Sequence, residues 1–258
     1  MAEPGSRIPV ILFLDFDGTL VPIREHPSLV SMPVSSRRFL QKLSRVPGVR
    51  LAVVSGRALS DLKKRTGVSG ICYVGNHGLQ MEGAGVRYLY PAVRRGKRVL
   101  SKIAREIRAA VDGIPGVWLE DKQFSLSLHF RQGSAAGKKK ARKLFFETVR
   151  PFVSAGKVKA TQGKEVLEVR LPVGWNKGRA VQWLLKKWSP GRSVPACVIA
   201  AGDDRTDEDM FRAISPGGIS ILVGGPGVAT RARYRVSTSA GLYRFLKELQ
   251  RQLLHSSR

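Results

Sequence analysis

Short apolar runs alternate with helix-like segments in the first and last thirds of the chain, and this alternation restricts the fold more than any other feature. The apolar runs cover residues 10–14, 49–54, 71–74, 196–201 and 219–223. The helix-like segments cover residues 35–44, 58–66, 177–188, 208–214 and 240–254. Continuous runs rich in Val, Ile and Leu are typical of strands that are buried on both faces. The pattern therefore predicts a Rossmann-like, doubly wound α/β fold, in which helices cover both faces of a parallel sheet.

The middle of the chain follows a different pattern. Helix-like segments cover residues 93–111 and 135–149, and strand-like runs cover residues 117–119, 124–130, 158–161 and 166–171. In the run at 124–130, apolar residues alternate with Ser125, Ser127 and His129, which is typical of an antiparallel strand with one solvated face. We therefore expect an α+β cap domain at residues 91–170, inserted into an α/β core formed by residues 1–90 and 171–258.

The chain is strongly basic. Its 45 Lys and Arg residues against 19 Asp and Glu residues give a formal net charge of +26. Basic clusters at 94–98 and 138–143 raise the alternative of a nucleic-acid-binding protein, but no aromatic residues interleave with them and no nucleic-acid motif is present. We therefore expect the charge to serve solubility and the attraction of anionic substrates, and nucleic acid is not the expected main partner.

Membrane association and disulfide bonds are not expected. No apolar run reaches the roughly 18 residues that a membrane helix needs. The run near the start ends at Asp15 without a small-residue cleavage site, so a signal peptide is not expected either. Cys72 and Cys197 both lie in apolar runs, where buried, reduced thiols are the usual state. Together these features predict a cytoplasmic protein.

Acidic residues follow two of the predicted strands. Asp15 and Asp17 come directly after the first run, and the run at 196–201 is followed by Asp203, Asp204 and Asp207. Ligands bind at the carboxyl ends of parallel strands, and two acidic clusters there would repel each other without a cation between them. Carboxylate oxygens suit Mg²⁺, so we expect a magnesium site. A calcium loop is disfavoured, because its required Gly and Glu are replaced by Leu20 and His26.

Six short motifs occur in order between about residues 10 and 225. They are Asp15-Phe16-Asp17-Gly18-Thr19, Val54-Ser55-Gly56-Arg57, Gly75-Asn76-His77-Gly78, Glu168-Val169-Arg170, Asn176-Lys177-Gly178 and Gly202-Asp203-Asp204-Arg205-Thr206-Asp207-Glu208-Asp209. Together they resemble the motifs of the haloacid-dehalogenase-like phosphatases and, more closely, those of the trehalose-6-phosphate phosphatase family. Leu171 departs from that family, which usually has Pro at this position.

The resemblance implies a Mg²⁺-dependent phosphatase of trehalose biosynthesis that hydrolyses trehalose 6-phosphate through an aspartyl-phosphate. Asp15 would be the nucleophile, Asp17 the general acid and base, and Ser55 and Lys177 the groups that bind the phosphoryl oxygens. Mg²⁺ would be held by Asp15, the backbone carbonyl of Asp17 and Asp203. Asp204 or Asp207 would complete the site, either directly or through water.

The resemblance also implies the residues that bind the substrate: Gly56, Arg57, Asn76, His77, Lys164 and Glu168. Lys164 competes with Lys177 for the phosphate. We assign the phosphate to Lys177, which opens a helix after a strand and loop, and the sugar to Lys164 and Glu168. A surface ion pair between Lys164 and Glu168 is the alternative.

Two questions about substrate and partner stay open at this point. The alternative function is a related capped phosphatase acting on sucrose phosphate or mannosyl-phosphoglycerate, because specificity resides in the inserted cap while the core chemistry is shared. A trehalose-phosphate synthase is the protein partner that the resemblance raises.

Overall fold

The computed structural model describes residues 9–163, 165–189 and 197–255. The chain divides into two compact units. One is formed by Met1–Tyr88 together with Trp175–Arg258, and the other by Leu89–Gly174, where the sequence pattern predicted 91–170. Each unit is described by itself below, as the core unit and the inserted unit.

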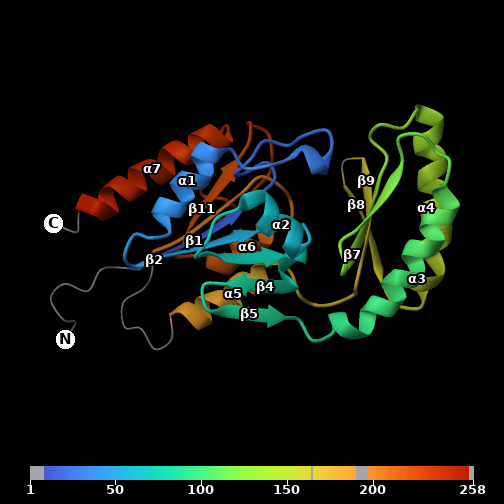
Figure 1. The fold of residues 1–258 in the computed structure, drawn as a ribbon, viewed down its shortest axis with the longest axis horizontal. Coiled ribbons are helices and arrows are strands. Elements are labelled where there is room, and N and C mark those ends of the chain that lie inside the picture. The colour runs from blue at the N-terminus through green and yellow to red at the C-terminus, as the bar shows by residue number, and fades with distance from the viewer. Residues whose placement is uncertain (1–8, 164, 190–196, 256–258) are drawn as a thin grey trace. The chain divides into compact units, whose positions relative to one another are not determined.

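The core unit is built on an eight-stranded sheet (Figure 1). Its strand order is β12-β11-β10-β1-β2-β3-β4-β5, with parallel pairing from β12 to β3 and antiparallel pairing of β3 with β4. The strands are β1 (Val10–Asp15), β2 (Val49–Val54), β3 (Cys72–Gly75), β4 (Gln80–Gly83), β5 (Val86–Leu89), β10 (Cys197–Gly202), β11 (Ile219–Val223) and β12 (Tyr234–Val236).

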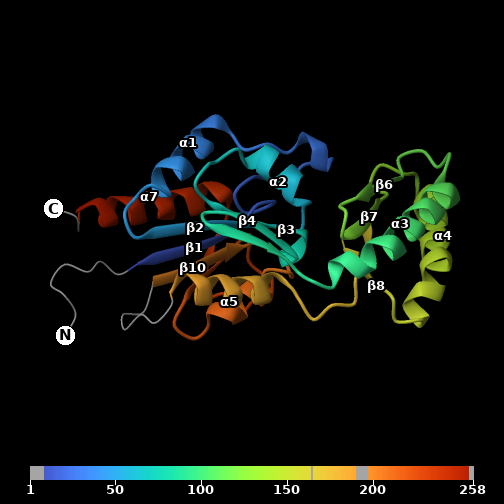
Figure 2. The ribbon, with the colours of Figure 1, turned by 60° about the horizontal axis from the view of Figure 1, so that its bottom comes forward.

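Helices cover both faces of this sheet, which confirms the predicted doubly wound fold (Figure 2). On one face, Leu12 and Leu14 of β1 pack with apolar residues of α1 (Val34–Leu43), α2 (Leu59–Thr66) and α7 (Ser239–His255). On the other face, Ile11 and Phe13 pack with α5 (Lys177–Trp188) and α6 (Glu208–Ile214). Two 3₁₀ turns, η1 (Pro27–Leu29) and η2 (Asn76–Gly78), complete the elements. Because β1 is buried on both faces, its sequence reads as one apolar run.

The inserted unit is an antiparallel sheet with two helices on one face. The sheet order is β6-β7-β9-β8, formed by β6 (Trp118–Asp121), β7 (Ser125–His129), β9 (Val166–Arg170) and β8 (Lys159–Gly163). The helices α3 (Val93–Val111) and α4 (Ala135–Ser154) lie side by side (Figure 1). Leu126, Leu128, Leu167 and Val169 are fully buried and share one face of the sheet by their alternation.

The predicted solvated face of β7 was wrong. Ser125 and Ser127 are 2% and 1% exposed, and the His129 side chain is 19% exposed, so the polar side chains of β7 are largely shielded from solvent. The strand register explains the cover, because Ser127 lies directly between Glu120 of β6 and Glu168 of β9. The longer side chains of the neighbouring strands shield the short serine side chains.

Both cysteines are free; Cys72 is fully buried, as predicted, whereas Cys197 is only half-buried. Burial raises the pKa of the Cys72 thiol to about 12. Across the described residues, no helix combines the length and the apolar character that a membrane crossing requires.

Candidate active site

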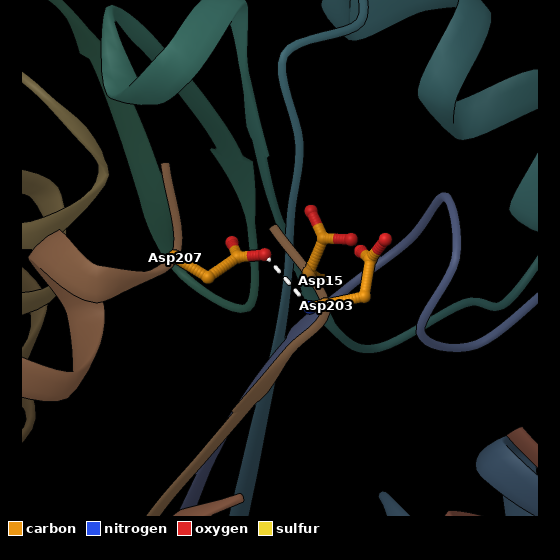
Figure 3. A group of neighbouring side chains, drawn as sticks. All are labelled: Asp15, Asp203 and Asp207. Carbon is orange, nitrogen blue, oxygen red and sulfur yellow. Dashed lines mark hydrogen bonds between the residues drawn. The ribbon is translucent and has the colours of Figure 1, made fainter. Parts of the chain in front are cut away.

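The site lies where β1 and β10 end. These strands pair in parallel, with Leu14 opposite Ala201, so the residues that follow them leave the sheet at the same edge. Asp15 and Asp203 are brought together in this way, and Asp207 joins them from the loop after β10 (Figure 3). One carboxylate oxygen from each of the three lies within 4.8 Å of the others. The predicted acidic cluster is therefore present, with three of the five carboxylates converging.

Lys177 lies inside this cluster. Its Nζ donates hydrogen bonds to Asp15 Oδ1 at 2.7 Å and to Asp207 Oδ1 at 2.8 Å, and the residue is only 3% exposed. The position follows from local sequence, because Asn176 caps α5 by accepting the N–H of Arg179, which makes Lys177 the first helical residue. Lys164, the competing candidate, lies outside the described residues.

Asp207 organises the loop after β10. Its Oδ2 accepts the backbone N–H groups of Asp203 at 3.0 Å and Asp204 at 3.1 Å, the first of which is drawn in Figure 3. Asp204 instead is exposed, and its Oδ1 accepts from both the N–H and the hydroxyl of Thr206 at 2.7 Å. Of the two carboxylates left open by the sequence, Asp207 lies with Asp15 and Asp203, and Asp204 lies outside that group.

The carboxylates carry more negative charge than the protein alone offsets. Burial, followed by repulsion from Asp207, raises the pKa of Asp15 well above its usual range, although Lys177 lowers it. Burial and the charges of Asp207 and Asp204 raise the pKa of Asp203 to about 7, and burial raises that of Asp207 to about 6. Three close oxygen donors with raised pKa values fit a hard divalent cation, whose charge would offset the repulsion.

Asp17 is held by an arginine. Arg57 Nε donates to Asp17 Oδ2 at 2.7 Å and Arg57 Nη2 donates to Asp17 Oδ1 at 2.6 Å, a two-point clamp. Arg57 also donates to Asp61 Oδ2 at 2.8 Å and to the carbonyl of Pro27 at 3.2 Å. The predicted role of Arg57 was substrate binding. In the structure, Arg57 donates its hydrogen bonds to Asp17, Asp61 and the Pro27 carbonyl, and it holds the Asp17 side chain in place.

The loops that carry the other predicted residues are tied together. Ser55 and Asn76 are both buried. The backbone N–H of Asn76 donates to the Arg57 carbonyl at 2.7 Å, and the backbone N–H of His77 donates to the Ser55 carbonyl at 3.0 Å. Gly56 lets the His77 ring approach closely, because a Cβ at this position would lie 2.4 Å from Cε1 of His77.

The two residues at the centre of these loops have unusual backbone or side-chain states. Asn76 and His77 have positive φ angles of 51° and 56°, which for residues other than glycine need support from the surrounding structure. Among the described residues, the Asn76 side-chain amide has no hydrogen-bond partner although it is buried. Ser55 Oγ accepts the N–H of Arg57 at 3.1 Å, so its hydroxyl proton can point elsewhere.

Two site residues were not assigned from the sequence, although both belong to the Asp15–Thr19 motif. Thr19 is fully buried and its hydroxyl donates to Asp203 Oδ1 at 3.2 Å. Gly18 has a φ of 81°, and a Cβ there would lie 2.0 Å from Asp203 Oδ2. The motif itself was the available signal, but the partner of both residues is 184 or more positions away and depends on the pairing of β1 with β10.

In the inserted unit, Glu168 is 8% exposed and lies in a polar network on the sheet face that α3 and α4 do not cover. Its Oε2 accepts Arg170 Nε at 2.5 Å, its Oε1 accepts the Ser127 hydroxyl at 3.4 Å, and Lys122 Nζ lies 3.7 Å from Oε1. The pairing of Glu168 with Lys164 stays a prediction, since Lys164 is outside the described residues.

His129 belongs to the same face. The sequence suggested a surface residue without a specific contact, but the structure gives it two partners. Its ring stacks on Trp118 with centroids 4.1 Å apart, and its Nε2 lies 2.9 Å from Glu120 Oε2. The polar face of the inserted sheet thus carries both donors and acceptors in fixed positions.

Known proteins resemble this chain over most of its length. The family model described as trehalose-phosphatase matches residues 13–239. The trehalose-phosphate phosphatase of Mycobacterium tuberculosis (strain H37Rv) is 34% identical over 255 residues, which cover 96% of this chain and 63% of that protein. The chain thus spans less than two thirds of the curated relative's length.

Solved structures give the same result for the fold. The crystal structure of a trehalose-6-phosphate phosphatase related protein aligns with a TM-score of 0.81 at 26% identity, covering 95% of this chain and 99% of that one. A phosphatase of the haloalkanoate (HAD) enzyme superfamily from Bacteroides thetaiotaomicron has a TM-score of 0.55 at 20% identity, covering 96% and 97%, and shares the fold. The haloacid-dehalogenase-like fold is confirmed, and with the family model matched over residues 13–239, the chain belongs to the trehalose-phosphatase family.

Proposed function

We propose that this protein hydrolyses trehalose 6-phosphate to trehalose and phosphate, with Asp15 as the nucleophile. The observation that carries the proposal is the buried group of Asp15, Asp203, Asp207 and Lys177 at the carboxyl ends of β1 and β10, in a chain of the trehalose-phosphatase family. A carboxylate beside a lysine and a cation site can attack phosphorus, because the positive charges offset its repulsion from an anionic phosphate.

The reaction proceeds in two displacements. An oxygen of Asp15 attacks phosphorus and the bond from phosphorus to the sugar oxygen breaks, while protonated Asp17 gives its proton to the leaving oxygen. Asp17 then takes a proton from water, which attacks phosphorus, breaks the aspartyl bond and releases phosphate and the free Asp15 carboxylate. Arg57 holds the Asp17 side chain at the site before substrate binds, and its contact with one carboxylate oxygen has to open for Asp17 to carry the proton.

Lys177 and Ser55 serve the phosphoryl group. Lys177 is already hydrogen-bonded to Asp15, so its ammonium lies next to the atom that forms the new bond and stabilises charge on the phosphoryl oxygens. The Ser55 hydroxyl donates a hydrogen bond to one of these oxygens. We place Asn76 and His77 beside the substrate as well, because the buried amide of Asn76 needs a partner.

The cation is proposed to be Mg²⁺. The residues that would hold it are Asp15, Asp203 and the backbone carbonyl of Asp17, with Asp207 supporting the site through the loop that it organises. When bound, Mg²⁺ would supply charge neutralisation and orientation for the phosphate. Thr19 fixes the carboxylate of Asp203 for this task.

Selection of the sugar is proposed for the inserted unit as a cap domain, residues 91–170. Trehalose offers many hydroxyl groups, and the face that carries Glu120, Lys122 and Glu168 supplies charged acceptors and donors for them. Lys164 is proposed to act with Glu168. We further propose a cytoplasmic location, and a trehalose-phosphate synthase as the partner that supplies the substrate.

A panel of phosphorylated sugars tests this proposal. Trehalose 6-phosphate, sucrose 6-phosphate, mannosyl-phosphoglycerate and glucose 6-phosphate are compared by phosphate release at matched Mg²⁺ concentration. We expect the highest kcat/KM on trehalose 6-phosphate. A preference for sucrose 6-phosphate or mannosyl-phosphoglycerate would instead support the alternative of a related capped phosphatase.

A further inference from the structure

The two helices of the inserted unit carry a large share of the positive charge of the chain. Together α3 and α4 contain 13 of its 45 Lys and Arg residues but only two of its 19 acidic residues, Glu106 and Glu147. The rest of the sequence is basic as well, but at lower density. This concentration was attributed above to solubility and to the attraction of anionic substrates.

The charge gathers on the side of the helices that faces away from the sheet. On α3, the buried residues Leu100, Ile103 and Ile107 occupy one side, as expected for a helix packed on a sheet. The exposed basic residues of α3 stand three or four positions apart on the opposite side, and α4, which packs against α3, exposes Lys139 and Lys143. We define the outer cationic face as six of these exposed residues: Arg94, Arg98, Lys102, Arg105, Lys139 and Lys143.

Most of these side chains have no carboxylate partner among the described residues. Within the described residues, no carboxylate forms an ion pair with Arg94, Arg98 or Arg105. The nearest contacts of the face are weak, with Lys102 at 3.9 Å from Glu106 and Lys143 at 3.9 Å from Glu147. Lys102 also lies over the ring of Phe152, with its Nζ 5.6 Å from the ring centroid. Like charges four positions apart, such as Arg94 and Arg98, destabilise a helix.

The outer cationic face takes no part in the polar network that is proposed to bind the sugar. The polar network around Glu168 lies on one side of the inserted sheet, and α3 and α4 cover the other side. The outer cationic face is a further layer away, beyond the helices. Charges there are separated from the polar sheet face by the whole thickness of the unit and are strongly screened at physiological salt.

We propose that the outer cationic face binds the phosphodiester backbone of nucleic acid, without reading its sequence. Residues four apart on a helix are about 6 Å apart along its axis, and Arg94 to Arg105 spans roughly 16 Å, so the face is an extended array suited to several phosphates in a row. Three of its four α3 residues are arginines, whose planar guanidinium groups pair with phosphate oxygens in a two-point geometry.

An anionic membrane fits the face less well. Helices that lie on membranes insert a wide apolar side below their basic side. Among the described residues, α3 exposes no large apolar side chain, and α4 exposes Phe146 and Val153. Phe146 is the exposed aromatic side chain among the described residues of these two helices, and a single ring does not make a platform for stacking successive single-stranded bases.

The test measures fluorescence anisotropy of a fluorescein-labelled 20-base-pair DNA duplex with the full chain over a series of salt concentrations. The variant Arg94→Gln, Arg98→Gln, Arg105→Gln removes three charges from the outer cationic face. Its matched control, Arg38→Gln, Lys42→Gln, Arg45→Gln, removes three exposed charges on and just after α1 of the core unit. All six residues are exposed and none belongs to the proposed catalytic site, so phosphatase activity and circular dichroism check that both variants are folded.

We expect the parent chain to bind the duplex, with log affinity falling linearly with log salt concentration. The α3 variant should bind about tenfold more weakly or worse at 50 mM salt, and its slope should be smaller by about 2.7, since each lost phosphate contact removes about 0.9. The α1 control should change affinity less than about threefold.

Three results would overturn the proposal. The first is no binding of the duplex at 50 mM salt. The second is an equal loss of affinity in the α3 and α1 variants, which would assign binding to net charge alone. The third is sedimentation with phosphatidylserine vesicles that the α3 variant abolishes while duplex binding stays unchanged, which would assign the face to an anionic membrane.

Discussion

At the scale of single residues, the site is organised by pairs that fix one charged group against another. Lys177 holds Asp15 and Asp207, Thr19 holds Asp203, and Arg57 holds Asp17. A group that must act in the reaction is thereby kept in one position before substrate arrives, which lowers the cost of reaching the transition state. Gly18 shows how tight the arrangement is, because any side chain there would occupy the place of the Asp203 carboxylate.

The Arg57 clamp predicts a dependence on the leaving group. Arg57→Ala frees Asp17, so proton delivery to the sugar oxygen becomes inefficient, and kcat on trehalose 6-phosphate should fall about tenfold or more. The nitrophenolate of p-nitrophenyl phosphate needs no proton to leave, so kcat on this substrate should fall much less. Steady-state kinetics on both substrates measure the difference.

Arg65→Ala is the control for the clamp, because Arg65 pairs with Asp61 and leaves the contact between Arg57 and Asp17 in place. It should change both rates little. Equal losses on the two substrates in the Arg57 variant would contradict a positioning role for Arg57 and point to a general loss of structure.

At the scale of helices and strands, several elements were predicted to the residue, whereas α4 extends to Ser154, beyond its predicted end at 149. The predicted bounds of β2, α3, α5, α6 and β11 coincide with the observed ones. The strands β4, β5 and β12 were missed because each has only three or four residues and too few buried positions to form a pattern.

The gathering of acidic side chains at this edge of the sheet could be predicted from local sequence, but which of them meet could not. Acidic residues directly after two buried strands indicated a cation site from local sequence alone. Which carboxylate would join that site depended on the fold of the loop after β10, where Asp207 turns inward to accept two backbone N–H groups and Asp204 turns outward. The partner of Arg57 was equally hidden, because Asp17 is 40 positions away in the sequence.

The polar face of the inserted sheet predicts a separation of sugar recognition from chemistry. Glu168→Ala removes a buried acceptor, so kcat/KM on trehalose 6-phosphate should fall about tenfold or more, in line with the loss of a hydrogen bond to a charged group. On p-nitrophenyl phosphate, which has no sugar, the fall should be small. Kinetics on the two substrates, with the melting temperature checked for each variant, measure this.

Glu165→Ala is the control, because Glu165 belongs to the same β8–β9 hairpin but pairs with Lys138 of α4. Its effect should be slight on both substrates. Equal losses on both substrates in the Glu168 variant would show that Glu168 stabilises the fold and does not bind the sugar. No loss on either substrate would likewise exclude Glu168 from sugar recognition.

At the scale of the whole molecule, the buried carboxylates link stability to pH and to metal. The pKa of Asp203 is raised to about 7 from an ordinary value of 3.8. Between these values the folded state therefore binds more protons than the unfolded state, so stability falls as pH rises through this window. Above it, the ionised carboxylates repel one another unless a cation binds between them.

Mg²⁺ should therefore raise the melting temperature more at pH 8 than at pH 5, where protons compete for the same oxygens. At 100 times its Kd, a ligand adds about 2.7 kcal/mol of stability. For a chain of this size that is a shift of several degrees, since 1 kcal/mol corresponds to about 2–4 °C. Differential scanning fluorimetry with Mg²⁺ or EDTA at matched ionic strength measures it.

Asp203→Asn is the control for metal binding and should abolish the stabilisation by Mg²⁺. A Mg²⁺ effect that is the same at both pH values, or that persists in this variant, would place the cation elsewhere on the protein.

Phosphate release from trehalose 6-phosphate in the presence of Mg²⁺, measured for the parent chain and for Asp15→Asn in parallel, tests the proposed reaction most directly. The amide keeps the shape of Asp15 but is no longer an anionic nucleophile. We expect turnover by the parent chain, loss of that turnover in EDTA, and no measurable turnover by a folded Asp15→Asn variant. Substantial release of phosphate by Asp15→Asn, or none by the parent chain, would contradict the assignment of Asp15 as the nucleophile of a trehalose-6-phosphate phosphatase.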